Sequence, residues 1–348
     1  MTMKWNKKND ILALMVGHGM QLNGVWDTGC VYGKYNEAAL MLKIVKYAVN
    51  ILRRCGVRTI TDADKNNNRN MKSSVAWANK VGAKRYISVH CDYSEATAGV
   101  APLYRTSAGM EMAKKIAKYV SKHMGMKYKG VFKRADLYEL NATDMPATIF
   151  ETGAIKADLK YLKKYKRYGR ALAKGILEYI GVPYISKKAY KLAKTADKLA
   201  YEGCPDKARY PQGKPTDDYK KALNDVYPKR KSWSDAPRKG ASCDVFVGTV
   251  VRESGVDKKF PRALSSQMKY LDKSKTFTLI KNATYKTLRD GDIIIYKKKN
   301  SNGGHICMFV EDKIKHASYK KWYGRTTNNE KTIMSKSGKS WVRVYRVL

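Results

Sequence analysis

The sequence has few histidines and cysteines, and it lacks the close spacings that mark structural metal sites and disulfide frameworks. Five histidines occur in 348 residues, and none forms an HExxH pair. The six cysteines show no CxxC spacing, so neither a zinc knuckle nor a disulfide scaffold is predicted. We expect the thiols to be reduced.

Long apolar runs are also missing. The run Ile11–Val16 is too short for the hydrophobic region of a secretory signal, and no segment reaches the length of a membrane span. The sequence therefore predicts a protein that is made in the cytoplasm without a signal peptide and has no membrane span.

Acidic residues are scarce. Thirty Asp and Glu residues stand against 70 Lys and Arg residues, which gives a formal net charge of +40. Such a charge attracts polyanions, whether nucleic acid, anionic membranes or phosphate-rich wall polymers. Lys greatly outnumbers Arg, the residue best suited to reading base edges, and no helix-turn-helix or zinc-finger motif occurs. Sequence-specific binding of nucleic acid is therefore not expected.

The length predicts two domains. In the first half, apolar runs alternate with amphipathic runs, which is typical of an α/β domain with a twisted, mostly parallel sheet flanked by helices. The second half has one apolar helix followed by short strands, which predicts an α+β domain with an antiparallel sheet. Gly181 and Pro183 end a helix, so we place the domains at 1–183 and 184–348, the second with an N-terminal helical linker segment.

Periodicity and end signals predict the individual elements. Helices are expected at Glu37–Arg54, Met110–Met124, Asp158–Ile180, Lys187–Tyr201 and Cys243–Glu253. Strands are expected at Ile11–Val16, Arg85–His90, Ala147–Phe150, Thr276–Ile280, Asp292–Tyr296, His305–Glu311, Lys313–Ser318 and Trp341–Val347.

The first half carries residues suited to a catalytic zinc ion. His18 and His90 each end a predicted strand, and Glu37 and Glu151 offer carboxylates. Two imidazoles and one carboxylate leave a tetrahedral Zn²⁺ one position for water, and a further carboxylate can take the proton from that water. Judged by spacing alone, the same four residues are also compatible with no metal site, as two hydrogen-bonded histidines and two surface glutamates. Cys91 follows His90, and the strand pleat would direct it to the opposite face as a packed thiol.

Longer motifs decide between these alternatives. They are Gly17-His18-Gly19, Asp27-Thr28-Gly29-Cys30-Val31, Asn36-Glu37, Ser88-Val89-His90, Arg134–Leu140 and Met145–Gly153. In this order, over roughly residues 9–180, they resemble the zinc-dependent N-acetylmuramoyl-L-alanine amidases. The resemblance implies that His18, Glu37 and His90 hold one Zn²⁺, that Glu151 is the general base, and that the amide between muramic acid and L-alanine of peptidoglycan is cut.

The second half carries a candidate nucleophile. Cys243 begins an apolar helix, where the helix N-terminus favours a thiolate. His305 and His316 lie on consecutive predicted strands, and a hairpin could bring both imidazoles to one face. A nucleophile, a base and an orienting group are what a cysteine peptidase needs, although a lone cysteine is also a common packing residue.

Four motifs resemble the NlpC-type cell-wall cysteine peptidases, which have a papain-like fold. They are Ala241–Val247, Arg289–Tyr296, Gly303–Val310 and Lys315–Ser318. The resemblance implies that Cys243 attacks, His305 is the base and His316 orients it, with cleavage in the stem peptide. A CHAP-type amidase or an acyltransferase remains an alternative for this half.

Together the two resemblances imply a bifunctional, endolysin-like peptidoglycan hydrolase of a phage or prophage, which acts on the cell wall after release from the host. Its positive charge would also favour adhesion to anionic wall polymers such as teichoic acid. The alternative from another class is a basic wall- or nucleic-acid-binding protein with two inactive hydrolase folds.

Overall fold

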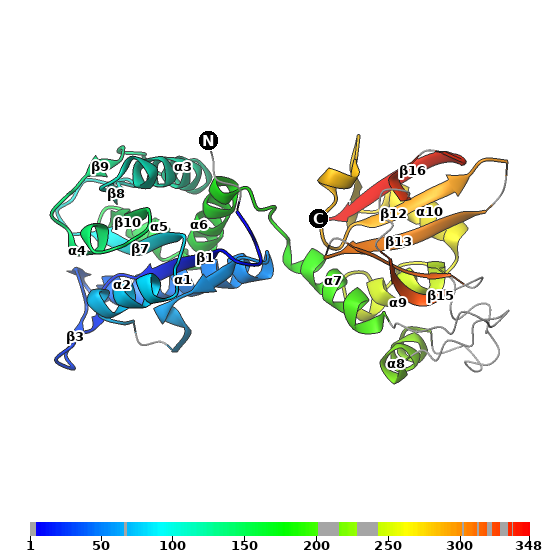
Figure 1. Cartoon of the computed structure of the whole chain (residues 1–348), viewed down its shortest axis with the longest axis horizontal. Helices are drawn as coiled ribbons and strands as arrows, with labels where there is room; N and C mark the ends of the chain where they lie inside the picture. The colour runs from blue at the N-terminus through cyan, green and yellow to red at the C-terminus, as the bar shows by residue number, and fades with distance from the viewer. Residues whose placement is uncertain are drawn as a thin grey trace. The chain divides into compact units, whose positions relative to one another are not determined.

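The computed structural model describes residues 5–65, 68–200, 216–227, 243–300, 303–311, 313–318, 322–327, 333–335 and 337–348. Within these ranges, the side chains of residues 65, 316–318 and 322–327 are not described. The chain divides into two compact units, Met1–Tyr184 and Ile185–Leu348 (Figure 1). This division lies one residue from the boundary expected from the sequence.

The first unit is built on a mixed sheet with the strand order β6-β1-β7-β10-β8-β9. Neighbouring strands from β6 to β10 are parallel, β8 is antiparallel to β10, and β9 is parallel to β8. The strands are β1 (Ile11–Val16), β6 (Arg58–Ile60), β7 (Arg85–Asp92), β8 (Leu103–Tyr104), β9 (Phe132–Lys133) and β10 (Ala147–Ala154). Two short hairpins follow β1: β2 (Gly19–Met20) with β3 (Trp26–Asp27), and β4 (Val31–Tyr32) with β5 (Tyr35–Asn36).

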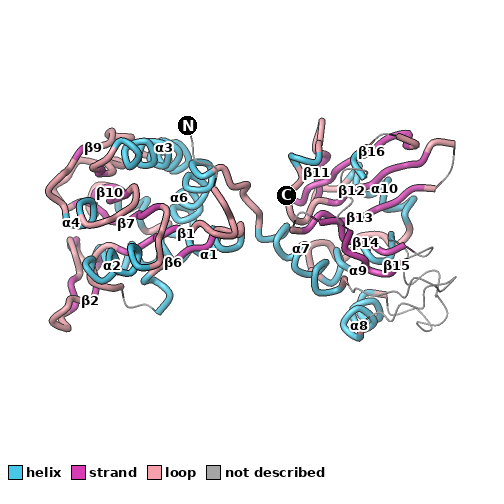
Figure 2. Tube along the Cα trace, in the orientation of Figure 1, coloured by secondary structure: helices cyan, strands magenta, loops and turns pink. Residues whose placement is uncertain are grey.

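Helices cover both faces of this sheet (Figure 2). They are α1 (Glu37–Arg54), α2 (Met71–Lys80), α3 (Ser107–Met124), α4 (Tyr138–Asn141), α5 (Leu159–Leu162) and α6 (Tyr165–Ile180), with a 3-10 turn at Asp62–Lys65. On one face, Ala13 and Met15 of β1 pack with Val75 of α2 and Leu140 of α4. On the other, α1 and α3 contact the sheet and α6 packs against both.

Helix α1 places a candidate metal ligand, because its first residue is Glu37. Its N-cap is Asn36, whose side chain accepts a hydrogen bond of 2.9 Å from the Ala39 N–H. Leu40, Ile44 and Ala48 are buried at helical spacing and hold the helix against the sheet. The cap and the apolar stripe therefore fix the first turn, and with it Glu37, at one end of the sheet.

The expected helix at Asp158–Ile180 is wrong in one respect, because the structure has two helices there. The Asp158 carboxylate is buried and accepts hydrogen bonds from the N–H groups of Gly99 and Ala154, which holds the α5 turn against the end of β10. Lys164 then leaves helical backbone geometry with ψ 47°, so α6 begins anew at Tyr165.

The second unit has an antiparallel sheet with the strand order β11-β16-β12-β13-β14-β15. The strands are β11 (Phe277–Leu279), β12 (Ile293–Lys298), β13 (Gly304–Val310), β14 (Lys313–Ser318), β15 (Trp322–Thr327) and β16 (Lys339–Val347). The helices are α7 (Lys187–Leu199), α8 (Asp217–Val226), α9 (Cys243–Glu253) and α10 (Leu264–Lys273), with a 3-10 turn at Tyr285–Thr287. Helix α9 packs on β13 and β14, which confirms an antiparallel α+β arrangement. Among the helices that the structure describes, none combines the length and apolar character needed to cross a bilayer.

Candidate functional site

The candidate zinc residues meet at one edge of the first sheet. Because β1, β7 and β10 are parallel, their carboxyl ends lie at the same edge, where α/β folds commonly bind ligands. His18 follows the end of β1, His90 lies near the end of β7, and Glu151 of β10 is the strand partner of His90. Glu37 arrives at the same edge as the first residue of α1.

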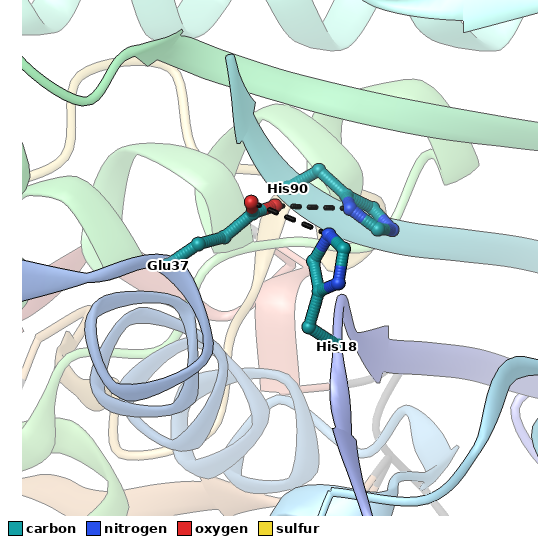
Figure 3. Close-up of side chains that lie close together, drawn as sticks. All are labelled: His18, Glu37 and His90. Atoms are coloured by element: carbon teal, nitrogen blue, oxygen red, sulfur yellow. Dashed lines mark hydrogen bonds and ion pairs between the residues drawn. The ribbon is translucent and has the colours of Figure 1, made fainter. Parts of the chain in front are cut away.

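The Glu37 carboxylate lies between the two imidazoles (Figure 3). Its Oε2 is 3.3 Å from His18 Nε2, and its Oε1 is 3.0 Å from His90 Nδ1. One donor atom from each of the three side chains lies within 4.8 Å of the others, and Glu37 is only 2% exposed. This donor set, two imidazole nitrogens and one carboxylate, is the set that catalytic zinc uses.

The charges within this cluster lower the pKa of Glu37 and raise that of His90. Burial acts to raise the pKa of Glu37, but the hydrogen bond and charge of His90 reverse this effect, so the pKa is below its ordinary value. Burial acts to lower the pKa of His90, but its contacts with Glu139 and Glu37 raise it well above the ordinary value. A divalent cation among the three side chains would supply the charge that a proton on His90 otherwise provides.

Each imidazole also has a carboxylate at its second ring nitrogen. His18 Nδ1 is 2.8 Å from Asp27 Oδ2, and His90 Nε2 is 3.3 Å from Glu139 Oε2. Such partners fix the orientation of metal-binding histidines and increase their basicity. Neither acid was assigned a role from the sequence. Their signal was present, because both lie within the motifs that carry the amidase resemblance.

Two glycines make room for the cluster. A Cβ at Gly17 would lie 2.4 Å from the His90 ring, and a Cβ at Gly29 would lie 2.6 Å from Glu37 Oε2. Gly29 has φ +64°, and His18 itself has φ +62°, a region that residues with side chains rarely adopt. Strain of this kind concentrates at functional sites, so the Gly17-His18-Gly19 turn serves to aim His18 rather than to stabilise the fold.

Glu151 lies in the same region, and one of its carboxylate oxygens, the buried Oε2, has no hydrogen-bond partner among the described residues. Burial raises the pKa of its carboxyl to about 8. A carboxyl group with a pKa near neutrality can both accept and release a proton, which suits a general acid–base residue.

Cys243, the candidate nucleophile, is the first residue of α9 and lies beside β13. The backbone N–H groups of Asp244, of Cys243 itself and of Ile306, the residue after His305, act to lower the pKa of the Cys243 thiol. Burial nevertheless raises the pKa of this thiol to about 11. The thiolate expected from the sequence is therefore not favoured here, because burial outweighs these backbone groups.

The two histidines expected to act with Cys243 lie on neighbouring strands, and the structure describes the side chain of His305 but not that of His316. His305 lies at the start of β13, half-buried, with its ring 5.8 Å from the Tyr296 ring. His316 lies on β14, where its backbone pairs with Arg325, but its side chain lies outside the described part of the chain. Residues 241 and 242 of the motif around Cys243 are also outside it. The structure thus brings Cys243 next to the residue that follows His305.

Comparison with protein families gives two matches. The sequence model of the N-acetylmuramoyl-L-alanine amidase family matches residues 12–181, and that of a bacteriophage peptidoglycan hydrolase family matches residues 262–348. The second match includes His305 and begins after Cys243. No curated protein matches the chain.

Several solved structures are similar to about half of the chain. The N-acetylmuramoyl-L-alanine amidase AmiC2 of Nostoc punctiforme is 23% identical, with a TM-score of 0.45, over 50% of this chain and 98% of its own. The catalytic domain of CwlV, an amidase from Bacillus (Paenibacillus) polymyxa, is 22% identical, with a TM-score of 0.45, over 50% and 99%. The catalytic domain of the endolysin CD27L, which targets Clostridia difficile, is 18% identical, with a TM-score of 0.41, over 49% and 97%.

The two family matches cover different units and concern the same polymer. The first includes His18, Glu37, His90 and Glu151. The chain is therefore a peptidoglycan hydrolase with an N-acetylmuramoyl-L-alanine amidase domain in its first unit and a phage-type peptidoglycan hydrolase domain at its C-terminus.

Proposed function

We propose that the first unit is a zinc amidase in which His18, Glu37 and His90 hold one Zn²⁺. The observation that carries this proposal is the Glu37 carboxylate between two imidazoles, each with a further carboxylate behind it. When bound, zinc polarises a carbonyl and makes hydroxide available near neutral pH. The bond cut is the amide between N-acetylmuramic acid and L-alanine.

Glu151 moves the protons of this reaction. Its unpartnered carboxylate oxygen takes a proton from the attacking water and then delivers it to the leaving amine of L-alanine. Burial keeps its pKa near the working pH, so both transfers are feasible. Asp27 and Glu139 act as positioning residues because each contacts its imidazole at the ring nitrogen that does not contact Glu37.

For the second unit we propose a cysteine endopeptidase of the NlpC type with a papain-like core. Cys243 Sγ attacks a stem-peptide carbonyl, His305 takes the thiol proton and gives it to the leaving amine, and water then hydrolyses the thioester. His316 orients His305. Because burial raises the pKa of Cys243 to about 11, the thiol does not ionise unaided, so proton removal by His305 is an essential step.

The positive charge would hold the enzyme on its polymer after release from the host cell. Lysines and tyrosines mix on the first unit, with Lys156 Nζ 5.7 Å from the Tyr32 ring and Lys163 Nζ 5.7 Å from the Tyr35 ring. Ammonium groups can bind wall phosphates while the rings pack against sugars. Equal binding to intact walls and to walls stripped of teichoic acid would contradict this role.

One experiment tests both activities. Purified peptidoglycan is digested with the full chain, with a metal chelator or a thiol alkylator added separately, and the fragments are analysed by mass spectrometry. We expect the chelator to remove only cuts at the muramic acid amide and the alkylator to remove only cuts within the stem peptide. His18→Ala and Cys243→Ala should reproduce the two patterns. If neither reagent changes the products, both assignments fail, and an acyl-transfer product would reassign the second unit.

A further inference from the structure

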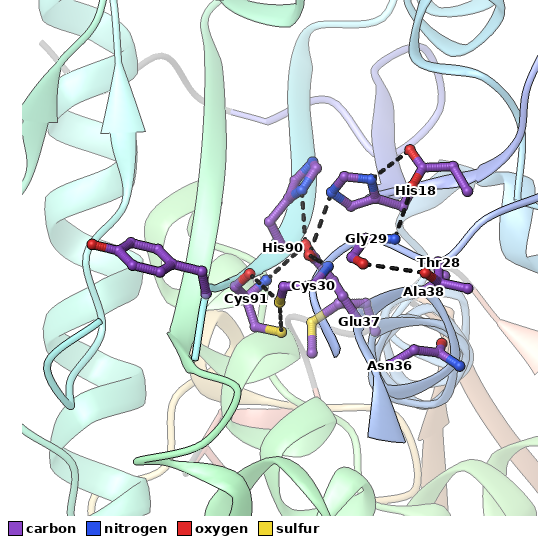
Figure 4. A network of polar contacts seen from close by, with 12 residues as sticks. His18, Thr28, Gly29, Cys30, Asn36, Glu37, Ala38, His90 and Cys91 are labelled. Carbon is purple, nitrogen blue, oxygen red and sulfur yellow. Dashed lines mark hydrogen bonds and ion pairs between the residues drawn. The ribbon is translucent and has the colours of Figure 1, made fainter. Parts of the chain in front are cut away.

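A pair of thiols lies behind the Glu37 carboxylate, away from the two histidines. Cys30 lies between the two short hairpins, and Cys91 is the residue after His90 in β7 (Figure 4). Their sulfur atoms are 3.7 Å apart. Cys91 is 4% exposed and Cys30 is half-buried, so the pair lies at the edge of the core. Cys91 is expected from the sequence to be a packed thiol, and the structure adds Cys30 as its neighbour.

The separation of the two sulfurs is that of ligands to one metal ion. Two thiolates about 2.3 Å from a tetrahedral Zn²⁺ lie about 3.8 Å apart. A disulfide would need about 2.05 Å. Both cysteines are free thiols, and the Cys30 Sγ also lies 3.4 Å from the Cys91 carbonyl oxygen and 3.5 Å from that of Asp92. The Cys30 thiol therefore donates its proton to these carbonyl oxygens, and metal binding would replace that proton.

Glu37 supplies a third donor. Its Oε1 accepts a hydrogen bond of 3.0 Å from the Cys91 N–H, and its Oε2 accepts one of 3.2 Å from the Cys30 N–H. Donor atoms of Cys30, Cys91 and Glu37 all lie within 4.8 Å of one another. The same carboxylate thus contacts the two imidazoles and the backbone of both cysteines, with the two sulfur atoms nearby.

We propose that Cys30, Cys91 and Glu37 form a second metal site, selective for thiophilic d¹⁰ ions such as Cd²⁺ or excess Zn²⁺. Soft thiolate ligands favour these ions over Mg²⁺ and Ca²⁺. Binding replaces the two thiol protons, which leave to solvent. Because Glu37 is common to both clusters, occupancy here withdraws it from His18 and His90, so excess metal inhibits the amidase. The thiol site itself does not depend on whether zinc is the catalytic metal.

The test is a Cd²⁺ titration of the full chain, reduced with a phosphine rather than a thiol. Thiolate-to-cadmium absorption in the ultraviolet reports sulfur ligation, and equilibrium dialysis counts the bound ions. We expect Cys30→Ser to lose one bound Cd²⁺ and the matching part of the absorption. The matched control is Cys307→Ser, which alters a buried thiol of the second unit and should retain both. Cys91→Ser should reproduce the Cys30→Ser result.

A further variant separates this inference from the proposed function. His18→Ala damages the histidine cluster only, so it should lose amidase activity and keep the Cys30-dependent absorption. Because Cys30 is only half-buried, we expect Cys30→Ser to fold, and circular dichroism checks that it does. The inference is overturned if folded Cys30→Ser binds as much Cd²⁺ as the wild type, or if Cys307→Ser loses as much absorption as Cys30→Ser does.

Discussion

Glu37 and Cys243 occupy equivalent places in the two units, since each is the first residue of a helix beside a strand of the central sheet. Their ionisation differs. Burial opposes the charge of both, but Glu37 has a pKa below its ordinary value, whereas the thiol of Cys243 has a pKa raised to about 11. The helix N-terminus is common to both and so does not explain the difference.

The partners explain it. Glu37 faces two imidazoles and accepts hydrogen bonds from two backbone N–H groups, those of Cys30 and Cys91. At Cys243 the backbone N–H groups of Ile306, Asp244 and Cys243 itself act to lower the thiol pKa, but they do not offset burial, and the charge of Asp244 raises the pKa further. A buried anion thus needs charged partners in addition to backbone donors and a helix end. In the first site the Glu37 carboxylate is therefore stabilised in its charged form, whereas in the proposed mechanism of the second site the thiolate of Cys243 would form only during the reaction.

The largest expected effect comes from the second site. Cys243→Ala removes the nucleophile and should lower stem-peptide cleavage by about 10⁴-fold or more. Cleavage of the muramic acid amide should stay within about twofold because the first unit has its own site and its own core. Quantified fragments from purified peptidoglycan measure both rates. Loss of both activities in the folded variant would contradict separate sites.

Glu151→Gln tests the proton-transfer role in the first unit. Losing a general acid–base group should lower amide cleavage by about 10²–10⁴-fold, while bound metal stays at the wild-type level because Glu151 is not a ligand. Glu37→Gln is the matched comparison, since it should lower both. Metal analysis after dialysis supplies the second measurement. Wild-type activity in Glu151→Gln would remove it from the mechanism.

The pH dependence of the free energy of unfolding tests the effect of burial on a carboxyl group, Asp62, whose hydrogen-bond donors in the described structure are uncharged. The Asp62 carboxyl accepts hydrogen bonds from Val16, Arg69 and Ser74, but burial raises its pKa from 3.8 to about 6. The folded state therefore holds this proton more tightly than the unfolded chain does. The resulting stabilisation is complete below about pH 3.8 and is lost as the pH rises through about 6.

Relative to Asp62→Asn, which does not ionise, the wild-type first unit should lose about 2 kcal/mol between pH 4 and 7.5. Urea unfolding followed by hydrogen exchange of peptides from Met1–Tyr184 measures this difference. Asp64→Asn is the control. Asp64 is exposed, and its hydrogen bond with Arg53 lowers the carboxyl pKa, so its smaller effect should have the opposite sign. A pH-independent difference for Asp62→Asn would contradict the raised pKa.

The sequence predicted the elements that carry strong local signals. Helices Glu37–Arg54 and Cys243–Glu253 have the expected bounds because apolar periodicity and end signals agree there. The break between α5 and α6 was not predictable, since the contact of Asp158 with Gly99 joins residues 59 positions apart. Helix α10 was missed although Leu264, Met268 and Leu271 recur at helical spacing, because the helix is short and Ala263 at its N-cap gives no end signal. Strand β15 was also missed.

In the candidate site, too, some residues could be predicted from sequence motifs, and others are recognised only from the contacts that the fold creates. His18, Glu37, His90 and Glu151 could be chosen because their residue types and motifs point to metal chemistry. Asp27 and Glu139 lie within the same motifs, but the motifs alone do not show which atoms they contact, because only the fold places each carboxylate at the outer nitrogen of a histidine. The Cys30–Cys91 pair was missed for the same reason, since the two residues are 61 positions apart.

The smallest expected effect comes from Glu139→Gln. This substitution alters a carboxylate that contacts His90 and leaves the three proposed metal ligands in place. Glu139 Oε1 accepts a 2.8 Å hydrogen bond from the Tyr86 hydroxyl, and its Oε2 faces His90 Nε2. An amide preserves the shape but loses the negative charge that makes the imidazole more basic. Metal affinity should therefore fall by about 10–100-fold.

Competition with a chelator of known affinity measures the loss, and stem-peptide cleavage should not change. The exposed Glu111→Gln provides the matched control, since Glu111 lies outside the histidine cluster and forms an ion pair with Lys115 on the surface of α3. Equal metal affinities in the two variants would show that His90 does not need a charged partner. The proposed cation would then be held by His18, Glu37 and His90 alone. The stabilisation of charge at the first site, compared with Cys243 in the second, would come from these three residues and not from the surrounding carboxylates.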